Sequence, residues 1–269
     1  MSAAHPQETA MTTPLKKNLV ALGTIVRREV MRILRIWGQT LVPPAITIKL
    51  YFIISGGLVV SDIGDMGGYT DMEFIVPGLV MMSIIQNSYG NISSSFFGAK
   101  FGRHVEELLV SPMPNWVILG GYVAGAVLRG LMVGVIVLAI AMFFTPVRIP
   151  HPLVTFTTVL LGATIFSLAG FVNAVFAKKF DDVAIVPTFI LTPLTYLGGV
   201  FYSVKLLPGW AEAATHANPI FYMVNAFRYG LLGTSDVPLW IAYVLMLAFV
   251  FGLGALGLWL LKKGVGLRS

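Results

Sequence analysis

One short stretch, residues 97–114, holds the charged side chains whose spacing best fits a chemical task. Arg103, Glu106 and Glu107 would share one turn of a helix, where they could form ion pairs or hydrogen bonds with another protein. Apolar residues recur through the stretch at helical spacing and prolines end it; they are Phe97, Phe101, Val105, Leu108, Pro112 and Pro114. We predict a short amphipathic helix by which another protein moves this one.

Motifs for catalysis, nucleotide binding or metal binding are absent from the sequence. It contains no GxxxxGK[ST] and no HExxH, its four histidines are scattered, and it has no cysteine. Gly252, Gly254 and Gly257 match a dinucleotide fingerprint by letters, but they lie in an apolar run without a strand and turn, so close helix packing is the better interpretation. We therefore predict no catalytic, cofactor-binding or metal-binding residue.

The composition is that of a membrane protein. Of the 269 residues, 57% are hydrophobic and 11% are charged, whereas soluble domains carry about 25% charged residues. The net charge of +6 does not indicate a nucleic-acid partner, because the basic residues lie at segment ends rather than on one patch. We expect the partners to be membrane lipids and other proteins.

Six apolar segments are each long enough to cross a bilayer, which needs about 20 residues. This pattern predicts an all-α, polytopic membrane protein whose spans cover approximately 38–60, 74–96, 115–144, 153–176, 183–203 and 238–261. In the third span, Gly121 with Gly125 and Gly130 with Gly134 are spaced for tight helix packing.

An amphipathic helix is predicted ahead of the first span, at 15–37, preceded by a disordered tail at 1–14. One stripe of this helix is apolar, and the other side carries Lys16, Lys17, Arg27, Arg28, Arg32 and Arg35. Basic amphipathic helices lie at anionic membrane surfaces. The alternative is a solvated helix packed on a partner, and we favour the membrane surface because the chain enters the membrane directly afterwards.

The distribution of Lys and Arg predicts the orientation. Thirteen lie in the flanks 16–35, 98–114, 177–182 and 262–269, and three lie in 61–73, 145–152 and 204–237. The first set is therefore expected to be cytoplasmic, with both termini inside. The outward connection 204–237 is half apolar but too short to span, so we predict one or two short re-entrant helices there.

Polar residues inside the predicted spans offer two interpretations. Lys49 and Arg129 would be costly against lipid, so they should face the protein, a cavity or a membrane edge. The second span carries amides and hydroxyls, of which Gln86, Asn87, Asn91 and Ser94 could line a pathway or form hydrogen bonds between helices. No acidic residue lies within a span core, so an energy source outside this chain, a separate ATPase subunit, is expected.

An ordered series of motifs resembles the membrane subunits of ABC-2-type ABC exporters, in particular a group of bacterial inner-membrane permeases. It covers nearly the whole chain after residue 27, and its strongest parts are residues 35–44, 74–78, 95–100, 106–112, 179–182, 187–203, 218–219 and 227–230. Lys49 has no counterpart role in that family.

The resemblance implies two paired permease subunits, each contacting a separate nucleotide-binding subunit that holds ATP and magnesium. It identifies 97–112 as the coupling helix, with Arg103, Glu106 and Glu107 as polar contacts and Phe101, Leu108 and Leu109 as the apolar anchor. It also implies an outward gate that includes Asn218, Pro219 and Arg228. The rival interpretations are a secondary carrier, which lacks an ion-coupling site here, a lipid enzyme, which lacks a nucleophile or metal site, and a non-transport scaffold, which stays open.

Overall fold

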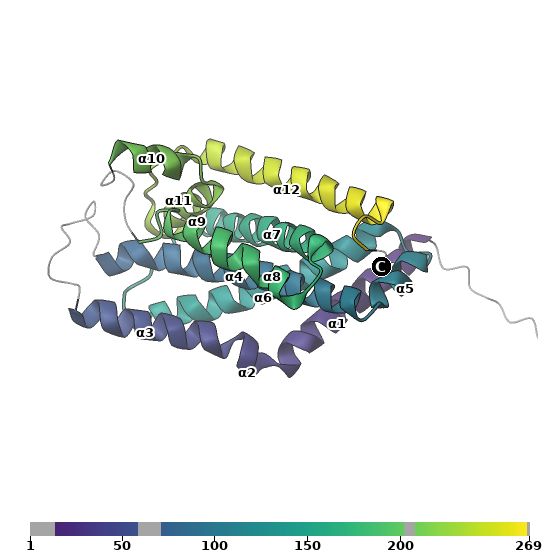
Figure 1. The fold of residues 1–269 in the computed structure, drawn as a ribbon. Coiled ribbons are helices and arrows are strands. Elements are labelled where there is room, and N and C mark those ends of the chain that lie inside the picture. The colour runs from purple at the N-terminus through teal and green to yellow at the C-terminus, as the bar shows by residue number, and fades with distance from the viewer. Residues whose placement is uncertain (1–13, 59–70, 202–207, 268–269) are drawn as a thin grey trace, which may run out of the picture.

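A computed structural model describes residues 14–58, 71–201 and 208–267 (Figure 1). Those residues form helices and connections, without a strand among them, as expected for an all-α protein. The predicted disordered tail, most of the outward loop at 61–73 and the outward Lys205 lie outside the described residues.

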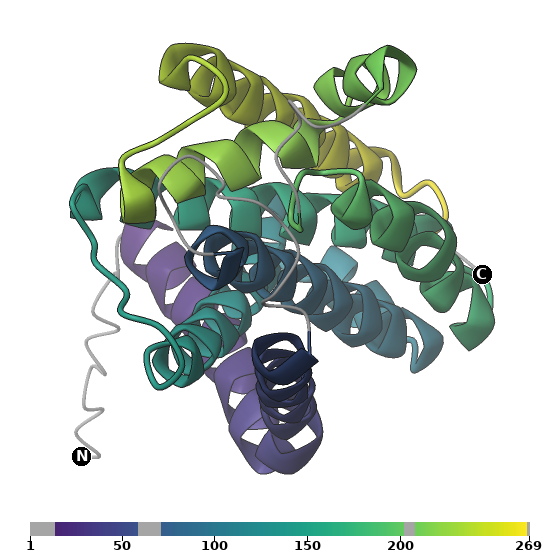
Figure 2. The same ribbon diagram turned by 90° about the vertical axis from the view of Figure 1, so that its left-hand side faces the viewer.

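Long helices run side by side along the bundle, each opposite in direction to the one before it except the last, which runs parallel to its predecessor (Figure 1). They are α3 (Val42–Leu58), α4 (Asp71–Phe101), α6 (Asn115–Ala141), α7 (Pro152–Phe176) and α12 (Leu239–Lys263). The helix α4 lies at the centre, with α6 and α7 as its most extensive neighbours (Figure 2). Of the helices described, α6, α7 and α12 are long and apolar enough to cross a membrane. The count of six spans stays a prediction.

The predicted fifth span is a helical segment in three parts rather than one uniform helix. The parts are α8 (Phe180–Val186), the π-helix η1 (Pro187–Leu191) and α9 (Thr192–Tyr196). Pro187 and Pro193 each lack a backbone N–H, which breaks the regular hydrogen-bond ladder. The Val183 carbonyl, four residues before Pro187, accepts a hydrogen bond from the Asn173 side chain at 3.1 Å, so a side chain satisfies a backbone acceptor at this break.

The helix α12 carries exposed tryptophans close to both ends, Trp240 and Trp259. They lie 19 residues apart in the sequence, which corresponds to about 28 Å along a helix, close to the hydrocarbon thickness of a bilayer. Tryptophan prefers the two membrane–water boundaries. The spacing therefore fits a membrane-crossing helix with most of its surface against lipid.

Glycines in α6 allow two neighbouring helices to pack unusually close to it. The first helix, α1 (Pro14–Arg35), packs along α6, where a Cβ on Gly121 would lie 2.6 Å from Ile25 and one on Gly125 would lie 2.5 Å from Glu29. On the α4 side, a Cβ on Gly134 would lie 2.7 Å from Ile84, and one on Gly130 would clash with Ser88. Both glycine pairs thus serve tight packing, as the sequence predicts.

The face of α1 that packs on α6 carries Ile25, Glu29 and Ile33, all buried. The predicted apolar stripe is open at its start, where Leu15 and Leu19 are more than half exposed, and becomes half-buried or buried toward Ile33. After α1, a short helix α2 (Trp37–Thr40) turns the chain into α3 (Figure 1). Trp37, expected as the last residue of the amphipathic helix, therefore belongs to α2 and is exposed.

Two short helices follow α9 at the end of the bundle opposite α5 (His104–Val110): α10 (Gly209–His216) and α11 (Pro219–Leu232) (Figure 1). This agrees with the expected helical character of 204–237. The helix α11 is buried along most of its length and packs on α4, α7 and α12. Close contact with α7 depends on Gly230, because a Cβ there would clash with Thr155.

Candidate functional site

The charged stretch 97–114 is divided between two helices. The helix α4 continues to Phe101, and α5 begins at His104. Arg103 separates them in the left-handed conformation, with φ of 59°. The predicted helix over 97–112 is therefore shorter than expected, because a left-handed residue cannot continue a right-handed helix. Ser111 ends α5 in an extended conformation before Pro112.

The exposed side of this turn differs in part from the predicted anchor. Val105 is buried in a cluster formed by the ends of α4, α6, α7 and α12, and Leu108 and Leu109 pack partly against the same cluster. Phe101 and Val110 are strongly exposed, and Phe101 packs beside the exposed Phe180 with ring centres 5.2 Å apart. We call Phe101, Arg103, Glu106, Glu107, Val110 and Phe180 the α5 surface; all are exposed.

Val110 and Phe180 are additions that sequence reasoning missed. Val110 follows the expected apolar pair directly, and its exposure depends on where α5 ends. Phe180 is distant in sequence and joins the surface only because α8 packs against α4. No local pattern in the sequence signals that contact.

Lys100 fastens the end of α4 to the end of α7. Its Nζ donates to the carbonyls of Val175 at 2.6 Å and of Ala177 at 2.8 Å, which are acceptors left free at a helix C-terminus. Burial, together with repulsion from Lys178, lowers the pKa of the Lys100 ammonium below its ordinary value. The end of α4, which carries Phe101 of the α5 surface, is thereby tied to the end of α7.

A polar cluster lies where α1, α4 and α6 meet, and we call it the polar seam. The Glu29 carboxylate is buried, accepts hydrogen bonds from the Ser95 hydroxyl at 2.7 and 2.8 Å and pairs with Arg32 at 3.1 Å. Arg28 also contacts Glu29, at 3.4 Å, and lies over the ring of Tyr122. The seam thus ties α1 to both neighbouring helices.

Two of the predicted pathway residues belong to the polar seam. The Asn91 Oδ1 accepts from Arg32 at 2.7 Å and from Arg129 at 3.5 Å, and the Asn87 Oδ1 accepts from Arg129 at 3.3 Å. Their side chains form hydrogen bonds between helices, which is the second of the two interpretations left open by the sequence. Arg129 is half-buried and faces α4, as expected for a charge in this helix.

The other two predicted pathway residues lie on a different face of α4. Gln86 is half-buried and Ser94 is exposed, with its hydroxyl bonded to the Gly90 carbonyl of its own helix at 2.7 Å. A Cβ on Gly90 or Gly98 would meet no other atom within 4 Å. Gln86, Gly90, Ser94 and Gly98 therefore form one open stripe along α4, which we call the open face.

Lys49 does not take the first of its three expected placements, toward the protein interior. It is exposed on α3, beside the exposed Ile46 and Leu50. The interior side of α3 is taken by Ile48 and Phe52, which are buried. The side chain of Lys49 is long enough to reach toward a membrane edge, the remaining expectation from the sequence.

Of the predicted outward-gate residues, Asn218 and Arg228 are buried and Pro219 is half-buried. Asn218 caps α11, accepting from the Ile220 N–H at 3.0 Å and donating to the Leu194 carbonyl at 2.6 Å, and Pro219 occupies the first turn. Arg228 donates to the Gly199 carbonyl at 2.7 Å and lies 3.8 Å over the ring of Phe74. These contacts join α11 to α9, to the turn after α9 and to α4.

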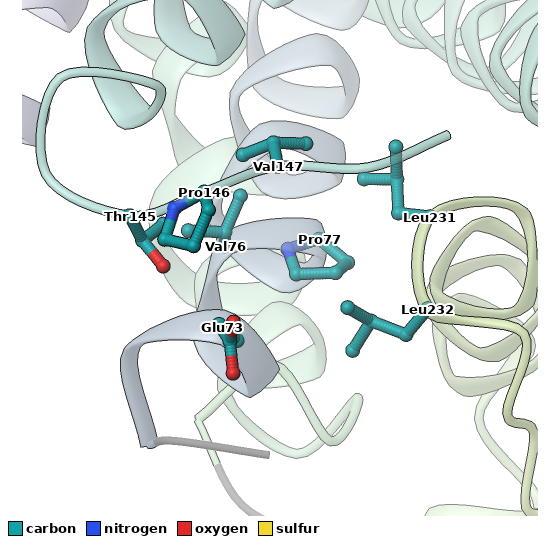
Figure 3. A pocket seen from close by; sticks show the side chains of 8 residues that line it. All are labelled: Glu73, Val76, Pro77, Thr145, Pro146, Val147, Leu231 and Leu232. Carbon is teal, nitrogen blue, oxygen red and sulfur yellow. The ribbon is translucent and has the colours of Figure 1, made fainter. Parts of the chain in front are cut away.

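A small hollow lies near these residues, between α4, the connection after α6 and α11 (Figure 3). Val76, Pro77, Pro146, Val147, Leu231 and Leu232 give it mostly apolar walls, with Glu73 and Thr145 as polar neighbours. Its volume is about 10 Å³, which is room for about one water molecule. It is too small to hold an amphiphilic substrate.

Comparison with known proteins agrees with this architecture. Residues 20–232 match the ABC-2 type transporter family. The chain is 55% identical over 250 residues to the inner membrane transport permease YadH of Escherichia coli K12, covering 93% of this chain and 98% of that protein. It is 23% identical over 183 residues to nodulation protein J of Neorhizobium galegae, covering 68% of this chain and 70% of that protein.

The family match spans well over half of the chain, and the similarity to the permease extends over nearly all of it. Together with the apolar helices, it supports a multi-pass location in a bacterial inner membrane and a transport role beside an ABC-type ATP-binding partner. This chain belongs to the ABC-2 type transporter family.

Proposed function

We propose that this chain is the permease subunit of an ATP-driven exporter, and that it moves an amphiphilic drug, lipid or glycan-like substrate out across the cytoplasmic membrane. The α5 surface is the observation that carries the proposal. It presents exposed apolar and charged side chains together, at a turn whose buried side holds the ends of four long helices. Such a surface suits a protein partner that must move those helices together.

ATP and magnesium are bound by the separate ATPase subunit. Phe101, Val110 and Phe180 provide the apolar contacts, and Arg103, Glu106 and Glu107 surround them with charge. When ATP draws two ATPase subunits together, α5 moves with its partner as a unit with the long helices, because Val105 is buried among their ends and Lys100 ties α4 to α7. The ATPase supplies the energy through its different affinities for the two states.

The substrate path follows the open face of α4 in a homodimer. In Figure 2, α4 lies between α3 on one side and the α8 to α9 segment on the other. Both flanking elements expose large apolar side chains, among them Ile46, Leu50, Phe189 and Ile190. A second copy packed against these elements would enclose the open face, including Gln86 and Ser94, in the complex. At the outward end, Asn218, Pro219 and Arg228 hold α11 as the gate.

Cross-linking and a charge reversal test the coupling role. Because the chain has no cysteine, Glu107→Cys introduces a single thiol that should cross-link, through a thiol-reactive reagent, to the co-expressed ATPase subunit. Glu107→Lys should abolish permease-stimulated ATP hydrolysis and export while membrane insertion stays normal. Glu212→Lys is the matched control, because Glu212 is also exposed but lies on α10, at the far end of the bundle from α5 (Figure 1). Normal ATP-driven export by the Glu107→Lys complex would contradict the proposal.

The same preparations distinguish an exporter from a secondary carrier and from a non-transport scaffold. A secondary carrier would export substrate in the absence of the ATPase, driven by an ion gradient. A scaffold would bind the ATPase but move no substrate. An exporter requires both the ATPase and hydrolysable ATP, so transport into inverted vesicles with and without each component distinguishes the three.

A further inference from the structure

The polar seam has more positive charge than its own carboxylate can balance. Arg28, Arg32 and Arg129 bring three guanidinium groups to the junction of α1, α4 and α6, and Glu29 is the single carboxylate bonded to them in the described part of the chain. Its two oxygens are already occupied by Ser95, Arg28 and Arg32. The cluster therefore carries a net charge of about +2.

Arg129 is the least satisfied of the three. Its acceptors are neutral amide oxygens, and the hydrogen bonds to them measure 3.3 and 3.5 Å. A guanidinium that donates to a carboxylate or phosphate forms shorter bonds, of about 2.7–2.9 Å. Three buried donor atoms of the seam have no acceptor among the described residues: Arg32 Nε, Arg129 Nε and Asn91 Nδ2. Buried donors without acceptors are costly, so the seam lacks a group that accepts hydrogen bonds and carries negative charge.

The position of the seam identifies what kind of anion can reach it. The C-terminal end of α1 leads through α2 into α3 (Figure 1), and Arg32 of the seam lies one helical turn before that end. Trp37 is exposed at this turn, as expected at a membrane boundary. The Arg32 side chain keeps 32% of its surface exposed, which leaves the seam accessible from outside the bundle. At that depth the abundant anions are lipid phosphates.

We propose that the polar seam binds the phosphate group of a membrane amphiphile from the cytoplasmic leaflet. Arg32 and Arg129 face one another across Asn91 and would hold the phosphate oxygens, since guanidinium groups match phosphate geometry. Binding of the phosphate would join α1 to α4 and α6 and would neutralise most of the excess charge. The site is separate from the open face of α4 and from the α5 surface, and its occupancy does not require the proposed ATPase coupling.

Native mass spectrometry of the full-length chain, released from a phosphate-free maltoside detergent, tests the proposal. The probes are dioleoyl phosphatidic acid, dioleoylglycerol with the same acyl chains but no phosphate, and inorganic phosphate. The wild-type chain should retain phosphatidic acid at one molecule per chain and should not retain dioleoylglycerol. Inorganic phosphate should not displace the lipid at equal concentration, because the acyl chains contribute to binding.

Substitutions of the seam arginines test whether the polar seam is the binding site. Arg129→Gln and Arg32→Gln should each weaken phosphatidic acid binding at least tenfold, and Arg129→Lys should retain part of it. Arg27→Gln is the matched control, because Arg27 lies on the same helix as Arg32, carries the same charge and is exposed; its binding should stay at the wild-type level. A melting temperature for each variant identifies loss of fold. Unchanged binding in folded Arg129→Gln, equal retention of dioleoylglycerol, or displacement by equimolar inorganic phosphate would each overturn the proposal.

Discussion

Gly125 of α6 lies so close to Glu29 of α1 that a Cβ on the glycine would be 2.5 Å from the Glu29 Cβ. We expect Gly125→Ala to push α1 away from α6 and to lower the free energy of unfolding by about 1–3 kcal/mol, the usual cost of overpacking. Gly120→Ala is the control, because its new methyl would lie 3.6 Å from Leu22, an ordinary contact. Thermal unfolding of the purified proteins measures both, and equal melting temperatures would show that α1 does not depend on this contact.

Lys100→Met tests the fastening between α4 and α7. The change keeps the side-chain length but removes two hydrogen bonds to the carbonyls of Val175 and Ala177. Because the ammonium group is partly exposed, we expect a loss of about 1 kcal/mol in stability. ATP hydrolysis stimulated by the permease should fall as well, since α5 would be less firmly held. Lys178→Met, at an exposed neighbour that repels Lys100, should leave stability unchanged or slightly raised.

Arg103→Gly separates stability from partner contact. Arg103 has φ of 59°, a conformation that costs L-residues about 1–2 kcal/mol and glycine little. We expect Arg103→Gly to be as stable as the wild type or more so, while its coupling to the ATPase falls because the guanidinium is gone. Arg103→Ala should lose coupling equally without the gain in stability. Full ATPase stimulation in both variants would remove Arg103 from the proposed contact.

The cap of α8 should weaken in acid. The Asp182 carboxylate accepts from the backbone N–H groups of Lys178 at 2.8 Å and Lys179 at 3.0 Å, and these bonds hold the pKa of Asp182 below its ordinary value. A lowered folded-state pKa contributes stability above the unfolded pKa of about 3.9, and the contribution is lost as the pH falls through the folded value. Hydrogen exchange at the two amides, corrected for intrinsic rates, should show protection at pH 7 that Asp182→Asn removes. Equal protection in both proteins would contradict the cap.

Much of the architecture is readable from the sequence because apolar runs and glycine spacing are local signals. The helical class, the close approach at Gly121 and Gly125 and the helices within 204–237 are all confirmed. The division of the charged stretch at Arg103 is not predicted from the sequence, because arginine has no preference for the left-handed conformation that it adopts there.

The polar seam and the open face are harder to predict from the sequence, because they depend on which side of each helix meets a neighbour. Asn87 and Gln86 are adjacent in sequence, yet one bonds to Arg129 and the other lies on the open face. The pairing of Glu29 with Ser95 joins residues 66 positions apart. Composition marks such residues as unusual in a membrane protein, but the packing of α1 against α4 and α6 decides their partners.

The contacts at the α5 end of the bundle constrain how many times the chain can cross it. Ile25 from the first helix, Val105 from α5 and Leu267 after the last helix share one hydrophobic cluster. A path that starts and finishes at the same end must traverse the bundle an even number of times between those points. We therefore expect an even number of complete crossings, and reporter groups attached just before α1 and just after α12 should be found on the same side of the membrane.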